Sequence, residues 1–404
     1  MNLWPLQKAW YRSFQSARRI YIKTLHFPAP EILSGESSIG RLPQLLKKYQ
    51  VHHVLIVTDQ GISRLGLMDD LLCALKEQGI HYSVYDQVLP NPTVENIEEA
   101  LQLYGQQRCE GVIGFGGGSP MDCAKLVAAR AANPSQSIKH MRGELRIKNK
   151  PAPIFAVPTT AGTGSEVTIA AVVKDAATHE KYAITDLKLM PLGAVLDPAL
   201  SSGLPAHITA ATGMDALTHA VEAYIGRNGT EFTNEKARRA VRLIFEHLPT
   251  AYCNGSNMQA RTNMLQAAND AGAAFTRAYV GYVHAIAHQL GGVYDVPHGL
   301  ANAILLPYVL EYYGNAAVPK LAELAIAGGI GTAKEPNAAL AAHFIEHVRH
   351  LNKNMNIPSK VKELREQDIP LIAQRAMQEG NPVYPVPKIM SIHECKNLLK
   401  KLLQ

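Results

Sequence analysis

The chain has 404 residues, of which 47% are hydrophobic and 18% charged, a balance typical of a globular protein with a large core rather than a disordered one. Its net charge of +6 is mild for this length, and no block of consecutive Lys or Arg stands out, which argues against a nucleic-acid partner. The length exceeds that of one ordinary domain and predicts two.

The cysteines predict a reducing environment. There are five, an odd number, and they are widely scattered without a CxxC pair: Cys73, Cys109, Cys123, Cys253 and Cys395. This pattern indicates neither a disulfide framework nor a thiolate metal site, so we expect a cytoplasmic location. No apolar run approaches the roughly 20 residues of a membrane-spanning helix, and no membrane partner is expected.

The first thirty residues differ in composition from the rest. They contain no acidic residue but several basic ones, and their aromatic and aliphatic side chains could form one helical face: Lys8, Arg12, Arg18, Arg19 and Lys23, with Trp4, Leu6, Trp10, Tyr11 and Phe14. One interpretation is a transit peptide. The other, which we favour, is an extension of residues 1–25 that packs on the body or on a second subunit.

Residues 26–204 alternate short apolar strands with helical stretches, as in a doubly wound sheet. The predicted strands are 51–58, 81–85, 111–115, 153–157 and 193–196, with a hairpin over 172–173 and 182–185. The predicted helices are 63–78, 94–106 and 121–132. This order predicts a Rossmann-like α/β domain with a mostly parallel sheet.

Residues 205–404 lack such strands. Ala-, Leu- and Ile-rich stretches at helical period occupy 207–226, 232–249, 257–276, 299–314 and 337–353. They predict an all-α C-terminal domain. The turn-rich segment 201–205 marks the boundary.

A glycine turn, Gly116-Gly117-Gly118-Ser119-Pro120, joins the predicted strand 111–115 to the predicted helix 121–132. Glycines let a backbone approach a phosphate closely, and the N–H groups of a helix start favour an anion. We expect Ser119 as the N-cap and Pro120 at the first helical position. A tight turn without a ligand is the alternative at this point.

A second loop of small and hydroxyl residues, 158–166, directly follows the strand 153–157. Two such loops at the carboxyl ends of two strands of one sheet meet at one edge, which suits a pyrophosphate. Asp59, after the strand 51–58, could accept from a ribose hydroxyl and would repel a 2′-phosphate, although by itself it is better explained as an ordinary turn aspartate. These features predict a dinucleotide, with NAD preferred.

The helical half contains a set of metal ligands. Asp215 and His219 are four residues apart and share a helix face, and His284 and His288 repeat that spacing. His298 follows His288 after nine intervening residues. Asp215, His219, His284 and His298 lie among apolar and small residues, where ionisable groups are costly without a compensating partner. Three imidazoles and one carboxylate suit Fe(II), Zn(II) and other divalent transition metals.

Taken together, these segments resemble one family, the iron-containing (group III) alcohol dehydrogenases. The resemblance covers nearly the whole chain after about residue 25 and rests on five motifs in family order. They are GGGSPMDCAK (116–125), PTTAGTGSEVT (158–168), DPAL (197–200), ATGMDALTHAVEAY (211–224) and HAIAHQLGGVYDVPHG (284–299).

The resemblance implies roles for individual residues. Metal ligands of the family match Asp215, His219, His284 and His298, and His288 matches a histidine near the nicotinamide and the substrate. Cofactor contacts match Asp59, Asn91, Gly117, Gly118, Ser119, Thr159, Thr163 and Lys181. Fe(II) is the metal expected first and Zn(II) second. His288 is our candidate for relaying a proton, with a packed, non-catalytic histidine as the alternative.

These features predict a metal-dependent oxidoreductase that transfers a hydride between NAD(H) and an alcohol/aldehyde pair, and a homo-oligomer, dimeric or larger. One alternative keeps the architecture but changes the chemistry, to glycerol, a hydroxy acid or maleylacetate as substrate, or to a dehydroquinate synthase-like lyase. The other is a non-catalytic protein that binds nucleotide and metal. Net NADH formation separates the dehydrogenase from the lyase, and turnover of short alcohols excludes the non-catalytic protein.

Overall fold

The computed structural model describes residues 3–176 and 180–404. The chain forms two compact units, and each is described by itself. The α/β unit comprises Phe27–Leu204 and Gly255–Gly272. The helical unit comprises the residues up to His26, Pro205–Asn254 and Ala273–Gln404.

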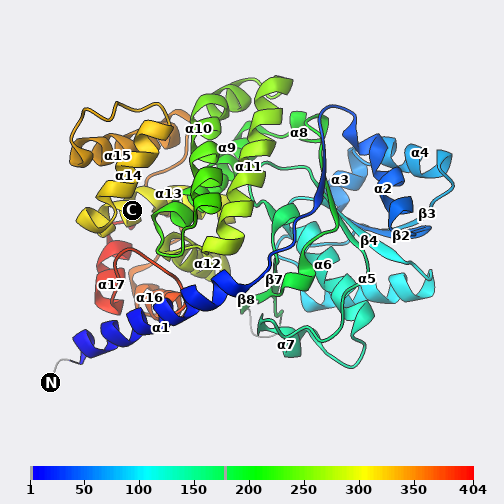
Figure 1. Ribbon diagram of the computed structural model, residues 1–404, viewed down its shortest axis with the longest axis horizontal. Coiled ribbons are helices and arrows are strands. Elements are labelled where there is room, and N and C mark those ends of the chain that lie inside the picture. The colour runs from blue at the N-terminus through cyan, green and yellow to red at the C-terminus, as the bar shows by residue number, and fades with distance from the viewer. Residues whose placement is uncertain (1–2, 177–179) are drawn as a thin grey trace. The chain divides into compact units, whose positions relative to one another are not determined.

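A six-stranded parallel sheet forms the centre of the α/β unit (Figure 1). Its strands are β1 (Glu31–Ser34), β2 (His53–Val57), β3 (His81–Tyr85), β4 (Gly111–Gly116), β6 (Ile154–Pro158) and β9 (Gly193–Leu196). They lie in the order β1-β9-β6-β4-β2-β3, and each neighbouring pair is parallel. Parallel neighbours require crossover connections, which here are mostly helical. The predicted α/β fold class is confirmed.

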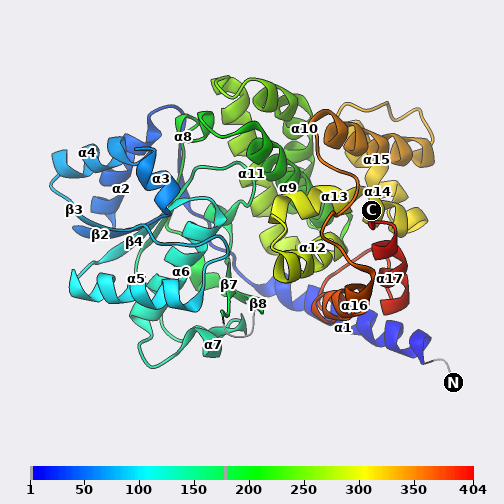
Figure 2. The ribbon, with the colours of Figure 1, turned by 180° about the vertical axis from the view of Figure 1, so that it is seen from behind.

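Helices cover both faces of this sheet (Figure 2). They are α2 (Leu42–Lys48), α3 (Gln60–Arg64), α4 (Asp69–Glu77), α5 (Val94–Gln106), α6 (Gly118–Ala132), α7 (Ile138–Met141) and α8 (Ala199–Ser202). Successive side chains of a strand point to opposite faces. Leu55 and Val57 therefore join the core formed with α5 and α6, while Val54 and Ile56 join the core formed with α2 and α4.

A smaller sheet lies in the same unit, with the order β5-β8-β7. β7 (Ala170–Lys174) and β8 (Lys181–Thr185) pair antiparallel, and β5 (Gly143–Glu144) pairs parallel with β8. The predicted hairpin is confirmed.

Two predictions for the α/β unit need correction. The helix predicted over 63–78 is two helices, α3 and α4, because Gly66 adopts a φ of +66°, which ends the first one. The sequence pattern also fails to predict β1. This strand has only four residues, and three of them are exposed, so it lacks an apolar signal.

The helical unit contains no strand among its described residues, which confirms the predicted all-α half. Its helices are α1 (Trp4–Thr24), α9 (Ala206–Ile225), α10 (Glu231–Cys253), α12 (Tyr282–Tyr294), α13 (His298–Tyr313), α14 (Val318–Ala327), α15 (Asn337–Asn354), α16 (Ile369–Gly380) and α17 (Ile392–Lys400). The division between the units falls within α11 (Met258–Ala278). α9 is buried continuously from Gly213 to Ile225 and packs against α10 and α13, so it forms the centre of this unit.

α1 packs on the body of the helical unit through one face. Arg12 donates to the carbonyl oxygens of Val386 and Pro387 at 2.7 Å each, and Gln15 donates to the carbonyl of Tyr384 at 2.7 Å. Gln15 is buried. Within the described residues, no helix is both long and apolar enough to cross a bilayer.

Candidate functional site

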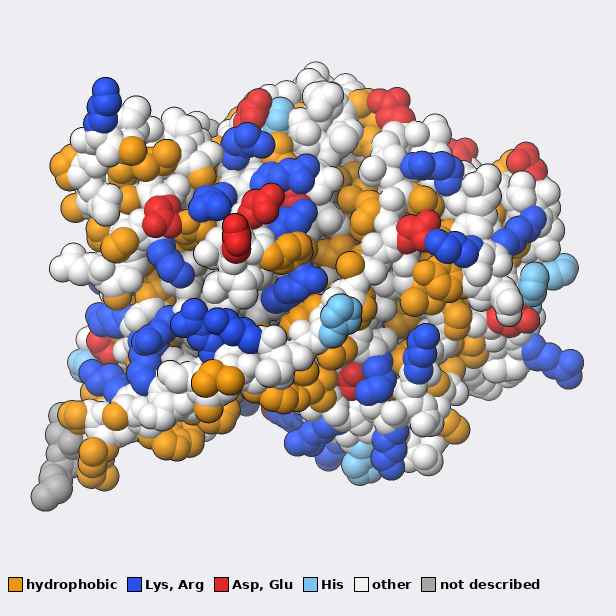
Figure 3. All heavy atoms as spheres, viewed as in Figure 1, with side chains coloured by type: hydrophobic (Ala, Val, Ile, Leu, Met, Phe, Trp, Pro, Cys, Tyr) orange, Lys and Arg blue, Asp and Glu red, His pale blue; other side chains and the backbone are white. Residues whose placement is uncertain are grey.

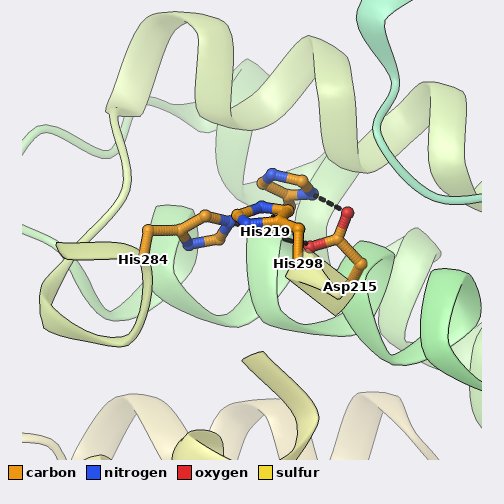
Figure 4. Close-up of side chains that lie close together, drawn as sticks. All are labelled: Asp215, His219, His284 and His298. Atoms are coloured by element: carbon orange, nitrogen blue, oxygen red, sulfur yellow. Dashed lines mark ion pairs between the residues drawn. The ribbon is translucent and has the colours of Figure 1, made fainter. Parts of the chain in front are cut away.

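The four predicted metal ligands come together in the helical unit (Figure 4). α9 supplies Asp215 and His219, α12 supplies His284, and α13 begins at His298. One ligand atom from each residue can be chosen so that all lie within 4.8 Å of one another. Residues more than 60 positions apart in the sequence therefore converge on one point.

The Asp215 carboxylate faces all three imidazoles. Its Oδ1 lies 3.5 Å from Nε2 of His298 and 3.9 Å from Nε2 of His284, and its Oδ2 lies 4.0 Å from Nδ1 of His219. The Asp215 side chain is only 3% exposed. A buried carboxylate among imidazoles is costly unless positive charge compensates it, and a divalent cation supplies that charge. The donor set fits Fe(II) or Zn(II).

Close packing of α13 on α9 brings His298 to this point. A Cβ on Gly299 would lie 2.3 Å from the carbonyl oxygen of Ala211, so only glycine allows the two backbones to approach this closely. Gly299 is therefore required for the helix packing that brings His298 to the cluster.

The two predicted nucleotide loops also come together, at the carboxyl ends of β4 and β6. These strands are neighbours, with Gly116 opposite Pro158, and the N–H of Thr159 donates to the carbonyl of Gly116 at 3.0 Å. A Cβ on Gly118 would lie 3.0 Å from Cγ2 of Thr163. The expectation that both loops meet at one edge of the sheet is confirmed.

The start of α6 differs from the prediction. The helix begins at Gly118 with Gly117 as its N-cap, whereas Ser119 was the expected cap and Pro120 the expected first residue. Ser119 lies inside the helix because its Oγ has another role, accepting the backbone N–H of Asn91 at 3.1 Å. Asn91 has a φ of +60°, in the left-handed region that few non-glycine residues adopt. The hydrogen bond to Ser119 holds this residue beside the start of α6.

The remaining predicted cofactor contacts occupy separate places in the α/β unit. Asp59 follows β2, the neighbour of β4, and is the N-cap of α3, where it accepts the N–H of Ile62 at 3.0 Å. One carboxylate oxygen therefore already has a structural partner. Lys181 lies on β8 in the smaller sheet.

Comparison with known proteins identifies the chain. The family model described as iron-containing alcohol dehydrogenase matches residues 29–198, and the model for the C-terminal part of the same family matches residues 209–403. Together these two matches span most of the sequence. The chain belongs to the iron-containing alcohol dehydrogenase family.

Individual relatives agree with this assignment. The chain is 41% identical to 1,3-propanediol dehydrogenase of Klebsiella pneumoniae, over 89% of this chain and 92% of the relative. It is 34% identical to the NAD-dependent methanol dehydrogenase of Bacillus methanolicus, over 94% and 100%. The solved structure of an alcohol dehydrogenase from Oenococcus oeni matches with a TM-score of 0.90 and 35% identity, over 94% of this chain and 100% of that one. The predicted family and enzyme class are confirmed.

In this iron-containing alcohol dehydrogenase, further residues hold the predicted ligands in place. Glu222 on α9 accepts from Nδ1 of His284 at 2.6 Å and from the backbone N–H groups of Gly281 and Val283 at 2.8 Å each. Burial raises the pKa of Glu222 to about 8, while these N–H donors act in the opposite direction. Burial, followed by the charges of nearby histidines, lowers the pKa of His284 well below its usual value.

Asn302, one helical turn after His298, contacts three of the predicted ligands. Its Nδ2 donates to Oδ1 of Asp215 at 2.7 Å and lies 3.2 Å from Nε2 of both His284 and His298. The ring of Phe275 stacks on that of His219, with their centroids 4.1 Å apart. Asn302 and Phe275 therefore both contact members of the cluster.

His288 lies beside the cluster, with its ring stacked on that of His298 at 5.3 Å. Its Nδ1 lies 2.6 Å from Oε1 of Glu379, which also accepts from the hydroxyl of Tyr384 at 2.8 Å. A carboxylate on Nδ1 favours the N–H at that nitrogen, which leaves Nε2 as an acceptor in the neutral ring.

A buried lysine supports the second nucleotide loop. Nζ of Lys125 on α6 lies within 3.1 Å of five oxygen atoms, contributed by Ser165, Thr168 and Ala170. Ser165 Oγ in turn donates to Asp122 at 2.8 Å, and Glu166 accepts from Asn269 on α11 at 3.1 Å. The loop is therefore fixed by a buried polar network.

Sequence reasoning missed these supporting residues, although some left a signal. Glu222 and Asn302 lie three and four residues after a predicted ligand, on the same helix face. Lys125 is the only charged residue between Asp122 and Arg130 on α6. Glu379 is 91 residues from His288, and no pattern in the sequence connects the two.

Proposed function

We propose that this chain is an NAD(H)-dependent, metal-dependent alcohol dehydrogenase, which transfers a hydride between the nicotinamide and an alcohol/aldehyde pair. Asp215, His219, His284 and His298 are the proposed ligands, with Fe(II) the first candidate and Zn(II) the second. This proposal rests on one observation, that one ligand atom from each of the four residues lies within 4.8 Å of the other three. When bound, a divalent ion lowers the pKa of an alcohol hydroxyl and, in the reverse direction, polarises an aldehyde carbonyl.

The chain's own residues supply orientation and proton transfer. Glu222 and Asn302 hold His284 and Asp215, so the ligand atoms are in place before a substrate arrives. His288 receives the hydroxyl proton at Nε2 while Glu379 holds its Nδ1, and passes that proton to solvent. In alcohol oxidation the hydride leaves carbon for the nicotinamide, and the products are an aldehyde, NADH and this proton.

The proposed nucleotide contacts are Asp59, Asn91, Gly117, Gly118, Ser119, Thr159, Thr163 and Lys181. Backbone N–H groups at the start of α6 favour a diphosphate, and the loop 158–166 supplies hydroxyls beside them. Asp59 supports NAD over NADP because a carboxylate repels a 2′-phosphate. Equal turnover with NADP would refute that preference.

Several broader features belong to the same proposal. We propose a homo-oligomer, dimeric or larger, in the cytoplasm, acting on a small alcohol or aldehyde without a nucleic-acid partner. We also propose that 26–204 is the dinucleotide-binding domain and 205–404 the metal-binding domain, after an extension of residues 1–25.

Metal removal tests the proposal. A chelator should abolish NADH formation from a panel of short alcohols, and Fe(II) or Zn(II) should restore it. Full activity in a preparation shown by metal analysis to be metal-free would contradict the metal-dependent scheme. Bound metal and nucleotide without any turnover would favour the non-catalytic alternative.

A further inference from the structure

Helix α1 turns its basic side toward the rest of the helical unit. At helical spacing, one side of α1 carries Lys8, Arg12, Gln15, Arg19 and Lys23. Figure 3 shows Lys and Arg side chains along the edge of α1 that faces this unit, with hydrophobic side chains along its outer edge. The helix precedes the residues that the family models match, so its attachment is a feature of this chain that the family assignment does not explain.

The attachment converges on one short segment of the chain between α16 and α17. Nη1 of Arg12 donates to the carbonyl of Val386, and Nη2 donates to that of Pro387, at 2.7 Å each. Nε2 of Gln15 donates to the carbonyl of Tyr384 at 2.7 Å, and its Oε1 accepts from Nη1 of Arg12 at 2.7 Å. Because the guanidinium donors form a rigid fork, they fix the two carbonyl groups relative to each other.

These contacts between α1 and the segment 384–387 are shielded from water. Gln15 is only 4% exposed. Burial, followed by the charge of Arg227, lowers the pKa of Arg12. A buried polar group that loses its partner costs free energy, since water does not replace the lost hydrogen bond. The folded chain therefore keeps Arg12 and Gln15 on these carbonyl groups.

The same segment supplies a side chain beside His288. The hydroxyl of Tyr384 donates to Oε1 of Glu379 at 2.8 Å, and this oxygen lies 2.6 Å from Nδ1 of His288. The carbonyl of Tyr384 is the group that Gln15 holds. One residue, Tyr384, thus connects α1 through its backbone to Glu379 and His288 through its side chain.

Contacts outside α1 hold the ends of this connection. Oδ1 of Asn381 accepts from the hydroxyl of Tyr282 at 2.7 Å, and the N–H of Met390 donates to the same hydroxyl at 3.0 Å. Between these ends, α1 side chains hold the backbone on both sides of Pro385, whose own carbonyl accepts a backbone N–H from the connection between α9 and α10 at 2.7 Å. Loss of the α1 contacts would therefore loosen the part that carries Tyr384.

The metal ligands depend on this segment less directly. Residues 385–387 line a small pocket together with Glu222. Glu222 takes its hydrogen bonds from groups at the start of α12, including His284, and not from the opposite wall of this pocket. Movement of the segment should therefore affect His288 while the metal cluster stays in place.

We propose that Arg12 and Gln15 are positioning residues for proton transfer at His288. By fixing the backbone around Tyr384, they keep its hydroxyl on Glu379. The carboxylate then stays on Nδ1 of His288 and leaves Nε2 as the acceptor. This inference rests on the proposed role of His288 in alcohol oxidation, and it gives the N-terminal extension a function in turnover.

Steady-state kinetics of the full chain with metal bound tests this proposal. In Arg12→Met with Gln15→Leu, kcat should fall about 3- to 10-fold, the size expected for one lost hydrogen bond, while metal content and the KM for NAD stay the same. Lys8→Met with Gln7→Leu is the matched control and should keep full kcat. It makes the same changes at exposed residues whose side chains contact α1 itself. Gln15→Leu alone is a milder form and should lower kcat about 2- to 5-fold.

A background without the Tyr384 hydroxyl separates positioning from general stabilisation. In Tyr384→Phe the α1 substitutions should lower kcat no further, because their effect passes through that hydroxyl. General loosening of the helical unit would instead multiply the two reductions in kcat.

A crystal structure of the Arg12→Met, Gln15→Leu variant tests the same step without turnover. The Tyr384 hydroxyl should lie beyond hydrogen-bond distance of Glu379, while the predicted metal ligands keep their places. If the unmodified chain formed no NADH with metal and nucleotide bound, the proposed function would fail, and this structure would still show whether α1 positions Tyr384. Four results would overturn the proposal: unchanged kcat, multiplied reductions in the Tyr384→Phe background, loss of metal in parallel with kcat, or a Tyr384 hydroxyl that remains on Glu379.

Discussion

The carboxylate of Glu222 lies 2.6 Å from Nδ1 of His284, on the side of the ring away from Asp215. Because the carboxylate favours the N–H at Nδ1, the lone pair of His284 is at Nε2, 3.9 Å from Oδ1 of Asp215. Two backbone N–H groups hold the same carboxylate, so the orientation of the ring is set by a group that is itself fixed.

We expect Glu222→Gln to weaken metal binding about 10- to 100-fold, because an amide is a poorer acceptor for the imidazole N–H. Competition with a chelator of known affinity measures the effect. Glu323→Gln is the control, since Glu323 is also in the helical unit and accepts from Tyr224 rather than from a predicted ligand. Unchanged affinity in Glu222→Gln would show that the contact does not orient His284.

Glu379 should act on turnover rather than on metal binding. In Glu379→Gln the support of Nδ1 of His288 is weakened, and we expect kcat to fall about 10- to 100-fold while the metal content stays the same. Tyr384→Phe removes only the neighbouring hydrogen bond to this carboxylate and should have a smaller effect. A parallel loss of metal and kcat would argue for a structural role instead.

The metal cluster and the nucleotide loops should be separable by mutation. His219→Ala should lose bound metal and still bind NADH, measured by metal analysis and by nucleotide fluorescence. Gly118→Val should do the reverse, because its Cβ would lie 3.0 Å from Cγ2 of Thr163 where the two loops meet. If either variant lost both functions in a folded chain, the assignment of the two functions to separate residue sets would fail.

The sequence predicts those parts of the site that depend on short-range spacing. Asp215 and His219 share a helix face at four residues, and the glycine turn follows a strand, so both were recognisable before the structure. Contacts between distant segments were not. The pairing of His288 with Glu379 depends on the packing of α12 against α16, and the role of Ser119 depends on the position of Asn91. Local pattern contains no information on such packing.

The buried ammonium of Lys125 should give the stability of the protein a characteristic dependence on pH. Burial lowers its pKa to about 8 from the ordinary 10.5, although nearby Asp122 and Glu166 act in the opposite direction. Below pH 8 both the folded and the unfolded chain are protonated at this residue. Between pH 8 and 10.5 the unfolded chain binds more protons, so the contribution of Lys125 to the free energy of unfolding rises with pH.

Comparison with Lys125→Met isolates this contribution, because the other titrating groups are common to both proteins. At pH 7 we expect the variant to be less stable by about 3 to 5 kcal/mol, since five oxygens lose the ammonium group as a hydrogen-bond donor. Urea unfolding should show this difference growing by about 3 kcal/mol between pH 8 and 10.5. A difference that stays constant with pH would mean that the five oxygens offset the cost of burial and keep the proton on Lys125.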